Sequence, residues 1–168
     1  MSLIIRPVTP ADAEATAHIY GHAVRFGTAS FELDPPDEAE MARRQHALVQ
    51  AGYPYLVAES EGRVLSYAYA GPYRSRPAYR YTVENSIYVA PDAQRRGIGR
   101  ALLNSLITEA GNRGFRQMIA IIGDSAQIAS IALHSAAGFR FVGTLEAVGY
   151  KHDRWLDTVL MQRALAAP

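Results

Sequence analysis

The sequence predicts a mixed α/β protein in which helices pack on one sheet. Short apolar runs typical of strands alternate with longer segments whose apolar residues recur every three or four positions. Read in order, the elements are β-α-α-β-β-β-α-β-α-β-β, and no repeat, low-complexity tract or linker interrupts them. A length of 168 residues fits one domain, so we expect residues 1–168 to form a single α/β (α+β) domain.

Composition excludes several classes of protein. The chain has 17 basic and 16 acidic residues and a net charge of +1, so nothing favours a nucleic-acid or membrane-surface partner. Cysteine is absent, which rules out disulfides and thiolate nucleophiles and agrees with a cytoplasmic location. Met1–Pro10 does not have the pattern of a signal peptide, and no apolar run approaches about 18 residues.

The first elements are a strand and a helix. Leu3–Val8 is a short apolar run that predicts a strand. The following helix can be capped by Thr9 or Asp12, and it ends near Phe26. Gly27–Pro36 contains glycine, hydroxyl residues and two consecutive prolines, which predict a loop.

A second helix and a hairpin come next. Asp37–Ala51 has helical spacing and is stopped by Gly52. Tyr55–Glu59 and Val64–Ala70 flank the turn Ser60–Arg63, which predicts a β-hairpin.

The centre of the chain contains a basic loop, a strand and an amphipathic helix. Pro72–Arg80 is a proline-containing loop, and Tyr81–Val89 is a strand. Apolar residues then recur every four positions through Ile98–Arg113, as on one face of a helix.

The last third contains three strands and a short helix. Phe115–Ile122 is nearly continuous apolar, which predicts a strand covered on both faces. Ala126–Ala137 is a short helix closed by Gly138, and Phe139–Gly149 and Trp155–Arg163 are two further strands.

The segment between Pro91 and the amphipathic helix is the strongest functional signal. It reads Gln94-Arg95-Arg96-Gly97-Ile98-Gly99, followed by Arg100. Glycines let a backbone approach an anion, and the free N–H groups and dipole of a helix start attract it. Taken alone, an ordinary β-to-α turn explains the loop equally well. A Walker A loop is excluded, and the dinucleotide fingerprint lacks its third glycine because position 102 is Leu.

In its surroundings this loop resembles a known cofactor motif. The string Gln-x-x-Gly-x-Gly, preceded by Val-x-Pro and followed by an amphipathic helix, is similar to the acetyl-CoA motif of GNAT N-acetyltransferases. The resemblance implies a mixed, mostly antiparallel sheet of about seven strands with a splayed wedge and helices on both faces. It also implies acetyl-CoA as co-substrate and no metal.

Further segments resemble one branch of that superfamily, the phosphinothricin and methionine sulfoximine/sulfone N-acetyltransferases. They form an ordered set between residues 28 and 157: Thr28–Glu32, Tyr53-Pro54, Tyr69–Tyr73, Tyr81–Val89, Leu133-His134 and Gly149–Asp157. The branch implies transfer of an acetyl group to the α-amino group of a small amino-acid-like substrate. It also implies a homodimer, for which the Gly149–Trp155 hairpin is a candidate interface.

The resemblance assigns cofactor residues. The strand ending at Val89 is expected to splay from the strand beginning near Phe115, and the pantetheine arm is expected in that wedge. Gln127 stands where the family has asparagine, three residues before a serine, so its contact is less secure. The expected cofactor-binding residues are Ile87, Tyr88, Val89, Gln94, Arg95, Arg96, Gly97, Ile98, Gly99, Arg100, Gln127 and Ser130.

Two residues are candidates for catalysis. By itself Glu84 reads as a solvent-facing strand glutamate, but the resemblance implies the general base, acting directly or through a water. His134 stands where many GNAT enzymes have a tyrosine that protonates the departing thiolate. A histidine there can serve as acid or as proton relay, and these alternatives stay open.

The expected substrate-binding residues are Phe31, Glu32, Arg74, Arg76, Asn85 and Ser86. Arginine is the bidentate partner of a substrate carboxylate, and Arg76 is favoured over Arg74. Alternative functions are acetylation of a polyamine, an aminoglycoside or a protein N-terminus, or acyl-CoA sensing without catalysis. The two arginines argue against polycations, because like charges repel.

Overall fold

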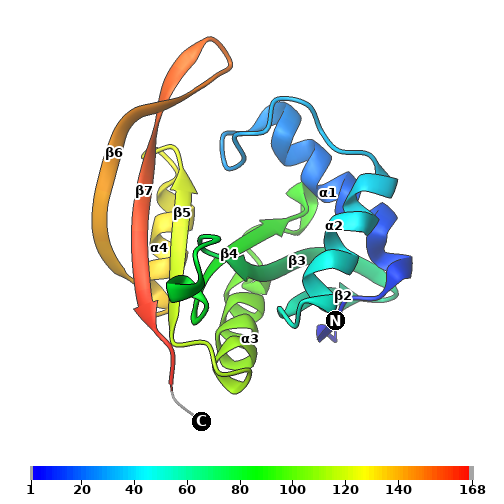
Figure 1. Cartoon of the computed structure of the whole chain (residues 1–168). Coiled ribbons are helices and arrows are strands. Elements are labelled where there is room, and N and C mark those ends of the chain that lie inside the picture. Colours follow the sequence, from blue (N-terminus) through cyan, green and yellow to red (C-terminus); the bar gives the residue numbers. More distant parts are fainter. Residues whose placement is uncertain (1, 167–168) are drawn as a thin grey trace.

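The computed structural model describes residues 2–166, which form a seven-stranded sheet of order β1-β2-β3-β4-β5-β7-β6 with four α-helices (Figure 1). The predicted order of elements and the mixed, mostly antiparallel sheet of seven strands are confirmed. The elements are β1 Ile4–Pro7, α1 Ala13–Phe26, α2 Glu38–Gln50, β2 Tyr55–Ser60, β3 Arg63–Pro72, β4 Thr82–Val89, α3 Ile98–Asn112, β5 Gln117–Gly123, α4 Ile128–Ala136, β6 Arg140–Lys151 and β7 Arg154–Ala164.

Local sequence explains the tight turns between neighbouring strands. Between β2 and β3, Glu61 and Gly62 have φ of 53° and 77°, and between β6 and β7, His152 and Asp153 have φ of 52° and 57°. Two-residue hairpins with both central residues at positive φ match the twist of the strands they join. Both hairpins therefore continue the sheet without a long loop.

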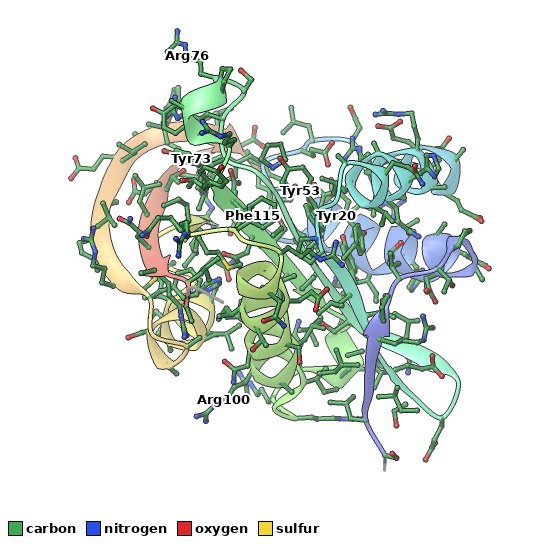
Figure 2. The ribbon with its side chains drawn as sticks, turned by 60° about the horizontal axis from the view of Figure 1, so that its bottom comes forward. Tyr20, Tyr53, Tyr73, Arg76, Arg100 and Phe115 are labelled. Carbon is green, nitrogen blue, oxygen red and sulfur yellow. The ribbon has the colours of Figure 1, made fainter. Side chains whose placement is uncertain are left out.

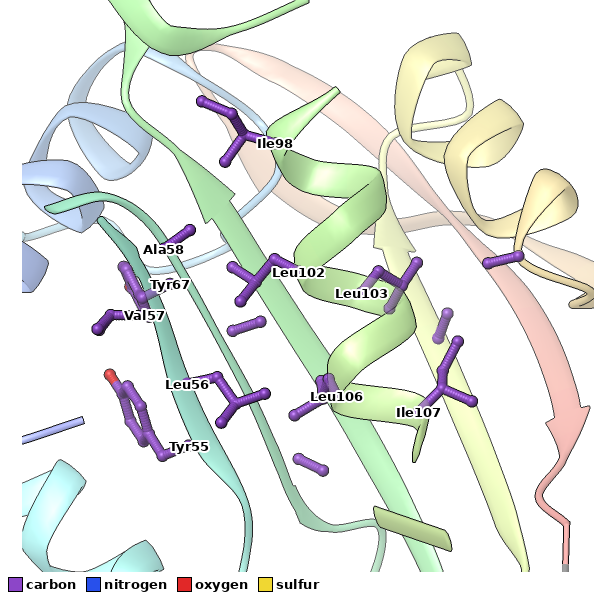
Figure 3. Close-up of a cluster of buried hydrophobic side chains, with 14 of the residues drawn as sticks. Tyr55, Leu56, Val57, Ala58, Tyr67, Ile98, Leu102, Leu103, Leu106 and Ile107 are labelled. Atoms are coloured by element: carbon purple, nitrogen blue, oxygen red, sulfur yellow. The ribbon is translucent and has the colours of Figure 1, made fainter. Parts of the chain in front are cut away.

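The core lies between the sheet and the buried side of α3 (Figure 3). Leu102, Leu103 and Leu106 are completely buried there, against small residues such as Ala58 and Ala68 of the central strands. Fully burying a leucine side chain contributes about 1.5–3 kcal/mol, so this helix is held firmly on the sheet. The position of its first turn is fixed as a consequence.

The sheet splays between β4 and β5. These strands pair in parallel only from Thr82–Gln117 to Asn85–Ala120. Beyond that point β4 continues along β3 as far as Val89, while β5 continues along β7 as far as Gly123. Figure 1 shows the two halves of the sheet diverging above this junction. The predicted wedge is confirmed, and it leaves the last half of β4 with one unpaired edge.

One burial prediction is corrected by the splay of the sheet, and α2 buries a polar residue while exposing an apolar one. The strand around β5 was expected to be covered on both faces, yet Ile121 is 39% exposed because it faces the opening of the wedge. In α2, Val49 belongs to the helical apolar pattern but is 44% exposed, whereas Gln45 is buried. Within residues 2–166, no helix has the length and apolar composition to cross a membrane.

Candidate active site

Alternation along β4 divides the predicted site between the two faces of the sheet. Side chains of successive strand residues point to opposite faces. Glu84 and Tyr88 lie on the α1/α2 face, where the Tyr88 ring packs edge-on against Tyr20 with centroids 4.9 Å apart. Asn85 lies on the other face and contacts His134 of α4. One short strand therefore serves two adjoining cavities.

The cavity on the α1/α2 face, called here the Glu84 pocket, contains four of the predicted catalytic and substrate-binding residues. It is lined by Phe31 and Glu32 from the loop after α1 and by Glu84 and Ser86 from β4. The fold thus brings together predicted residues that are more than 50 positions apart. Tyr88, predicted for the cofactor, also lines this pocket, and sequence reasoning missed the other lining residues, namely Tyr20, Ala29, Ser30, Tyr69, Ile121, Gly123 and Thr158.

Glu84 is the carboxyl group in this pocket without a partner. Within residues 2–166 its carboxylate forms no hydrogen bond or ion pair. Burial raises the pKa of Glu84 above its ordinary value, because desolvation disfavours the charged form. A partly buried carboxylate with a raised pKa is suited to accept a proton near neutral pH.

Glu32, by contrast, is held by three donors. Arg44 donates to both of its carboxylate oxygens at 2.8 and 3.0 Å, and the Tyr20 hydroxyl donates to one of them. The hydrogen bonds from Arg44 are the main reason that the pKa of Glu32 is lowered. Glu32 stays ionised and shapes the pocket wall. Arg44 was not predicted, and its spacing of four from Glu40 was the available signal.

The loop that carries Phe31 is anchored to the other half of the sheet. Lys151 of β6 is buried and donates to the Ser30 carbonyl at 2.7 Å. The Phe31 ring packs on Gly123 and Gly149, where an added Cβ would approach ring atoms to 2.8 and 2.3 Å. Both glycines therefore provide space for the ring, and the loop spans the open end of the wedge.

The cavity between β4, β5 and α4, called here the wedge cleft, contains Asn85 and His134. His134 is buried and its Nδ1–H donates to the Ser130 carbonyl at 2.8 Å. Because a carbonyl only accepts, Nε2 has the free lone pair and accepts from Asn85 Nδ2 at 2.9 Å. Burial lowers the pKa of His134, so the ring is neutral. The Asn85 Oδ1 atom is buried without a partner within residues 2–166.

The glycine loop begins where the wedge opens. A Cβ on Gly99 would lie 3.5 Å from Val89, 3.9 Å from Ile87 and 3.7 Å from Leu133, so α3, β4 and α4 meet here. Gly97 precedes the helix with φ of 76°, a conformation that favours glycine, and directs the first-turn N–H groups outward.

Three arginines surround the start of α3. Arg95, Arg96 and Arg100 are exposed, and within residues 2–166 none of them forms an ion pair. Arg100 extends into solvent in Figure 2. Their unpaired charges and the helix start are suited to an anion, and binding of the cofactor phosphates here stays a prediction.

The structure gives less direct support for three other predicted cofactor residues. Gln127 and Ser130 line the wedge cleft, but the Gln127 amide donates to Thr28 Oγ1 at 3.0 Å. The Tyr88 side chain packs on the α1/α2 face, so only its backbone adjoins the cleft. Their cofactor contacts stay predictions.

Arg74 and Arg76 do not line either cavity. Both are exposed on the loop between β3 and β4, and the Arg74 guanidinium lies over the Tyr73 ring at 5.2 Å. Figure 2 shows Arg76 at the tip of this loop, directed away from the body of the protein. Proline residues and a 3-10 turn at Pro77–Tyr79 carry the loop outward. Carboxylate binding by these arginines stays a prediction.

Comparison with known proteins identifies the class. The acetyltransferase (GNAT) family matches residues 15–139. The chain is 53% identical over 163 residues to a phosphinothricin N-acetyltransferase of Alcaligenes faecalis, covering 97% of this chain and 83% of that protein. It is 41% identical over 169 residues to an L-methionine sulfoximine/L-methionine sulfone acetyltransferase of Salmonella typhimurium, covering 99% and 98%.

A solved structure agrees. A phosphinothricin acetyltransferase of Sinorhizobium meliloti in complex with acetyl-CoA superposes with a TM-score of 0.95 at 48% identity, over 99% of this chain and 90% of that chain. The chain therefore belongs to the GNAT acetyltransferase family. It is an acetyl-CoA-dependent N-acetyltransferase.

The residues present fit acetyl-CoA. The unpaired edge of β4 offers backbone groups to an amide-rich chain, and the buried Asn85 Oδ1 lacks an N–H donor. The helix start beside Gly97 suits a pyrophosphate. Within residues 2–166, no group of three or more metal-ligating side chains is present.

Proposed function

We propose that this enzyme acetylates the α-amino group of a small amino-acid-like substrate of the phosphinothricin or methionine sulfoximine/sulfone type, with Glu84 as general base. One observation carries the proposal: Glu84 is an unpaired, partly buried carboxyl group in a pocket that adjoins the wedge cleft. The names of the relatives support the class of acceptor.

The reaction needs the amine in its neutral form. When bound, acetyl-CoA supplies an acetyl thioester, whose C–S bond breaks as the new C–N bond forms. Glu84 takes the proton that the amine must lose, directly or through a water, and leaves the nitrogen lone pair free. Ser86, two residues further along β4, lines the same pocket and can hydrogen-bond to the acceptor.

His134 acts in this proposal through Asn85. With Nδ1–H bound to Ser130 and Nε2 accepting from Asn85, the neutral ring has no free proton to give. It fixes the Asn85 amide so that Oδ1 faces the donors of the pantetheine arm. The arrangement supports a positioning or relay role over that of a general acid.

The cofactor is proposed to follow the wedge toward the glycine loop. Ile87, Tyr88 and Val89 would pair through their backbone with the pantetheine arm, with Gln127 and Ser130 on its other side. The pyrophosphate would lie on the turn at Gln94–Gly99, beside Arg100. Arg76, with Arg74 second, is proposed for the substrate carboxylate, which requires the β3–β4 loop to fold toward the pocket or to serve another copy.

The test is release of coenzyme A thiol from acetyl-CoA on addition of amino acids and their sulfone, sulfoximine and phosphinate analogues. We expect turnover with α-amino acids and none with their N-methylated or deaminated forms. Turnover with polyamines or peptides but with no free amino acid would refute the acceptor class. Acetyl-CoA binding without turnover on any amine would refute catalysis.

We further propose that two copies associate through the β6/β7 hairpin. The outer edge of β6 is unpaired, and Phe141, Val148, Tyr150 and Trp155 are 55–67% exposed on this hairpin. Exposed apolar patches of this kind mark protein interfaces. Sedimentation should give a dimer, and Trp155→Glu a monomer. We also propose a cytoplasmic location, which the lack of cysteine supports and cell fractionation tests.

A further inference from the structure

A third cavity lies under α2, on the same face of the sheet as the Glu84 pocket. Its volume is about 300 Å³. Helix α2 forms one wall, and the tyrosines of β2 and β3 form the floor. The residues that matter here are Met41, Arg44, Ala47 and Leu48 from α2, with Tyr55 and Tyr67 from the strands. No role in catalysis or cofactor binding is assigned to this cavity.

The cavity adjoins the Glu84 pocket. Tyr20 and Tyr69 line both spaces. The ion pair of Glu32 with Arg44 stands at the boundary, because Glu32 lines the pocket and Arg44 lines the cavity. A side chain that extends past Tyr69 from the pocket is therefore directed toward the space under α2.

The chemistry of the lining favours an uncharged, apolar group. The rings of Tyr55, Tyr67 and Tyr69 are nearly parallel, with interplanar angles of 11–22°, and form an apolar floor. The Arg44 guanidinium at the rim is already bound by Glu32 and Glu40. Arg43 is likewise paired with Glu40. The cavity thus offers no unpaired charge to a charged ligand, which would lose hydration without compensation.

We propose that this cavity is a side-chain subsite, which extends the acceptor range to neutral L-amino acids whose side chains are longer than that of phosphinothricin. The inference rests on the proposed function of the Glu84 pocket. The amino group would stay beside Glu84, and the distal, apolar part of the side chain would lie between α2 and the three tyrosine rings.

A homologous series of acceptors tests the subsite. S-methyl, S-propyl and S-hexyl homocysteine sulfone share one reactive end and differ only in chain length. Each methylene that enters an apolar cavity contributes about fourfold in affinity. We expect KM of the wild-type enzyme to fall at least about tenfold from S-methyl to S-hexyl, with kcat nearly constant. A KM that rises with chain length would overturn the subsite.

A variant that fills the cavity sharpens the test. Ala47 is on the exposed side of α2 and lines the cavity, so Ala47→Trp adds volume without disturbing the core. Ala47→Trp should remove the lower KM of the S-hexyl acceptor and leave kcat and KM for the S-methyl acceptor unchanged. The matched control is Ala39→Trp, on the same helix but outside the cavity lining. An equal effect of Ala47→Trp on both acceptors would overturn the proposal.

Different results would refute the proposed function and the side-chain subsite. A wild-type enzyme that acetylates the S-methyl compound but discriminates against S-hexyl refutes only the subsite. A wild-type enzyme that releases no coenzyme A with any of the sulfones or other free amino acids refutes the proposed function, and the subsite with it.

Discussion

The side-chain amide of Asn85 lies 2.9 Å from His134 Nε2, and it joins β4 to α4 across 49 residues of sequence. Both groups are buried, and the other ring nitrogen of His134 is bound to the Ser130 carbonyl. The histidine is thereby kept in one neutral tautomer, and the orientation of Asn85 is kept with it. This contact connects the two halves of the splayed sheet at the wedge cleft.

Asn85→Ala should destabilise the fold. The buried His134 Nε2 would lose its donor, and an unsatisfied buried acceptor costs about 1–3 kcal/mol. Urea unfolding should show this loss in the free energy of unfolding, with an unchanged slope. Asn104→Ala, at an exposed position of α3, is the control and should stay within about 0.5 kcal/mol of wild type. An Asn85→Ala protein as stable as wild type would contradict the hydrogen-bond assignment.

Glu84→Gln should lower kcat by about 10²- to 10⁴-fold, because the acceptor of the amine proton is lost. In the wild type, kcat/KM should fall as pH drops through the raised pKa of Glu84, since the protonated carboxyl cannot act as a base. That acid limb should be absent from the residual activity of the variant. Acetyl-CoA binding, measured by calorimetry, should change little, and exposed Glu61→Gln serves as control.

Gly97→Ala should raise the KM for acetyl-CoA. Gly97 has φ of 76°, and a Cβ there meets no atom within 4 Å, so the cost is backbone strain and not a clash. Left-handed backbone costs about 1–2 kcal/mol for a residue with a side chain, equal to about 5- to 30-fold in affinity if the turn changes. Gly143 likewise has free space around an added Cβ, but its φ is not positive. The control variant Gly143→Ala should therefore have the wild-type KM for acetyl-CoA.

Gly149→Ala should weaken acceptor binding through Phe31. The new methyl group would overlap the Phe31 ring, whose nearest atom lies 2.3 Å from the added Cβ, so the ring must move within the Glu84 pocket. We expect a several-fold higher KM for the amino acid and an unchanged KM for acetyl-CoA. In a Phe31→Ala background the same substitution should have almost no further effect. Additive effects of the two substitutions would show that Gly149 acts independently of the ring.

Asp12→Asn should lower stability in a pH-dependent way. Arg6 donates to both Asp12 oxygens at 2.8 Å, and this hydrogen bonding is the main cause of the lowered pKa of Asp12. A carboxyl group with a depressed folded-state pKa contributes stability above its unfolded pKa and loses it as pH falls through the folded value. The variant should be about 1–3 kcal/mol less stable than wild type at pH 7.

The difference from wild type should shrink as pH falls from about 4 toward 2, because the wild-type carboxyl then becomes protonated too. Thermal or urea unfolding of both proteins across this range measures it. A difference that stays constant at all pH values would assign the loss to packing.

Periodicity and turn residues predicted most of the elements, because local backbone preference and amphipathic spacing act over a few residues. The helix at Ile98–Asn112 and the tight hairpin between β2 and β3 are examples. The order of elements and the string Gln94–Gly99 predicted the acetyl-CoA-dependent family, and the family match and relatives confirm this. Spacing could not reveal that Ile121 faces an opening, because only the splay of the sheet exposes it.

The sequence by itself determined the chain's class and the residue types at its site, because motif, spacing and alternation are local properties. Tertiary structure decided which of these groups have a hydrogen-bond or ion-pair partner. Glu32 is a loop carboxylate and Glu84 a strand carboxylate, and the sequence does not distinguish their surroundings. In the structure Arg44 forms an ion pair with Glu32, whereas Glu84 is partly buried and has no partner within residues 2–166. Partners such as Asn85 and His134 meet only when distant segments pack, and burial lowers the pKa of His134. The glycine turn at Gln94–Gly99 was therefore recognisable in the sequence, whereas the unpaired, partly buried state of Glu84 was not.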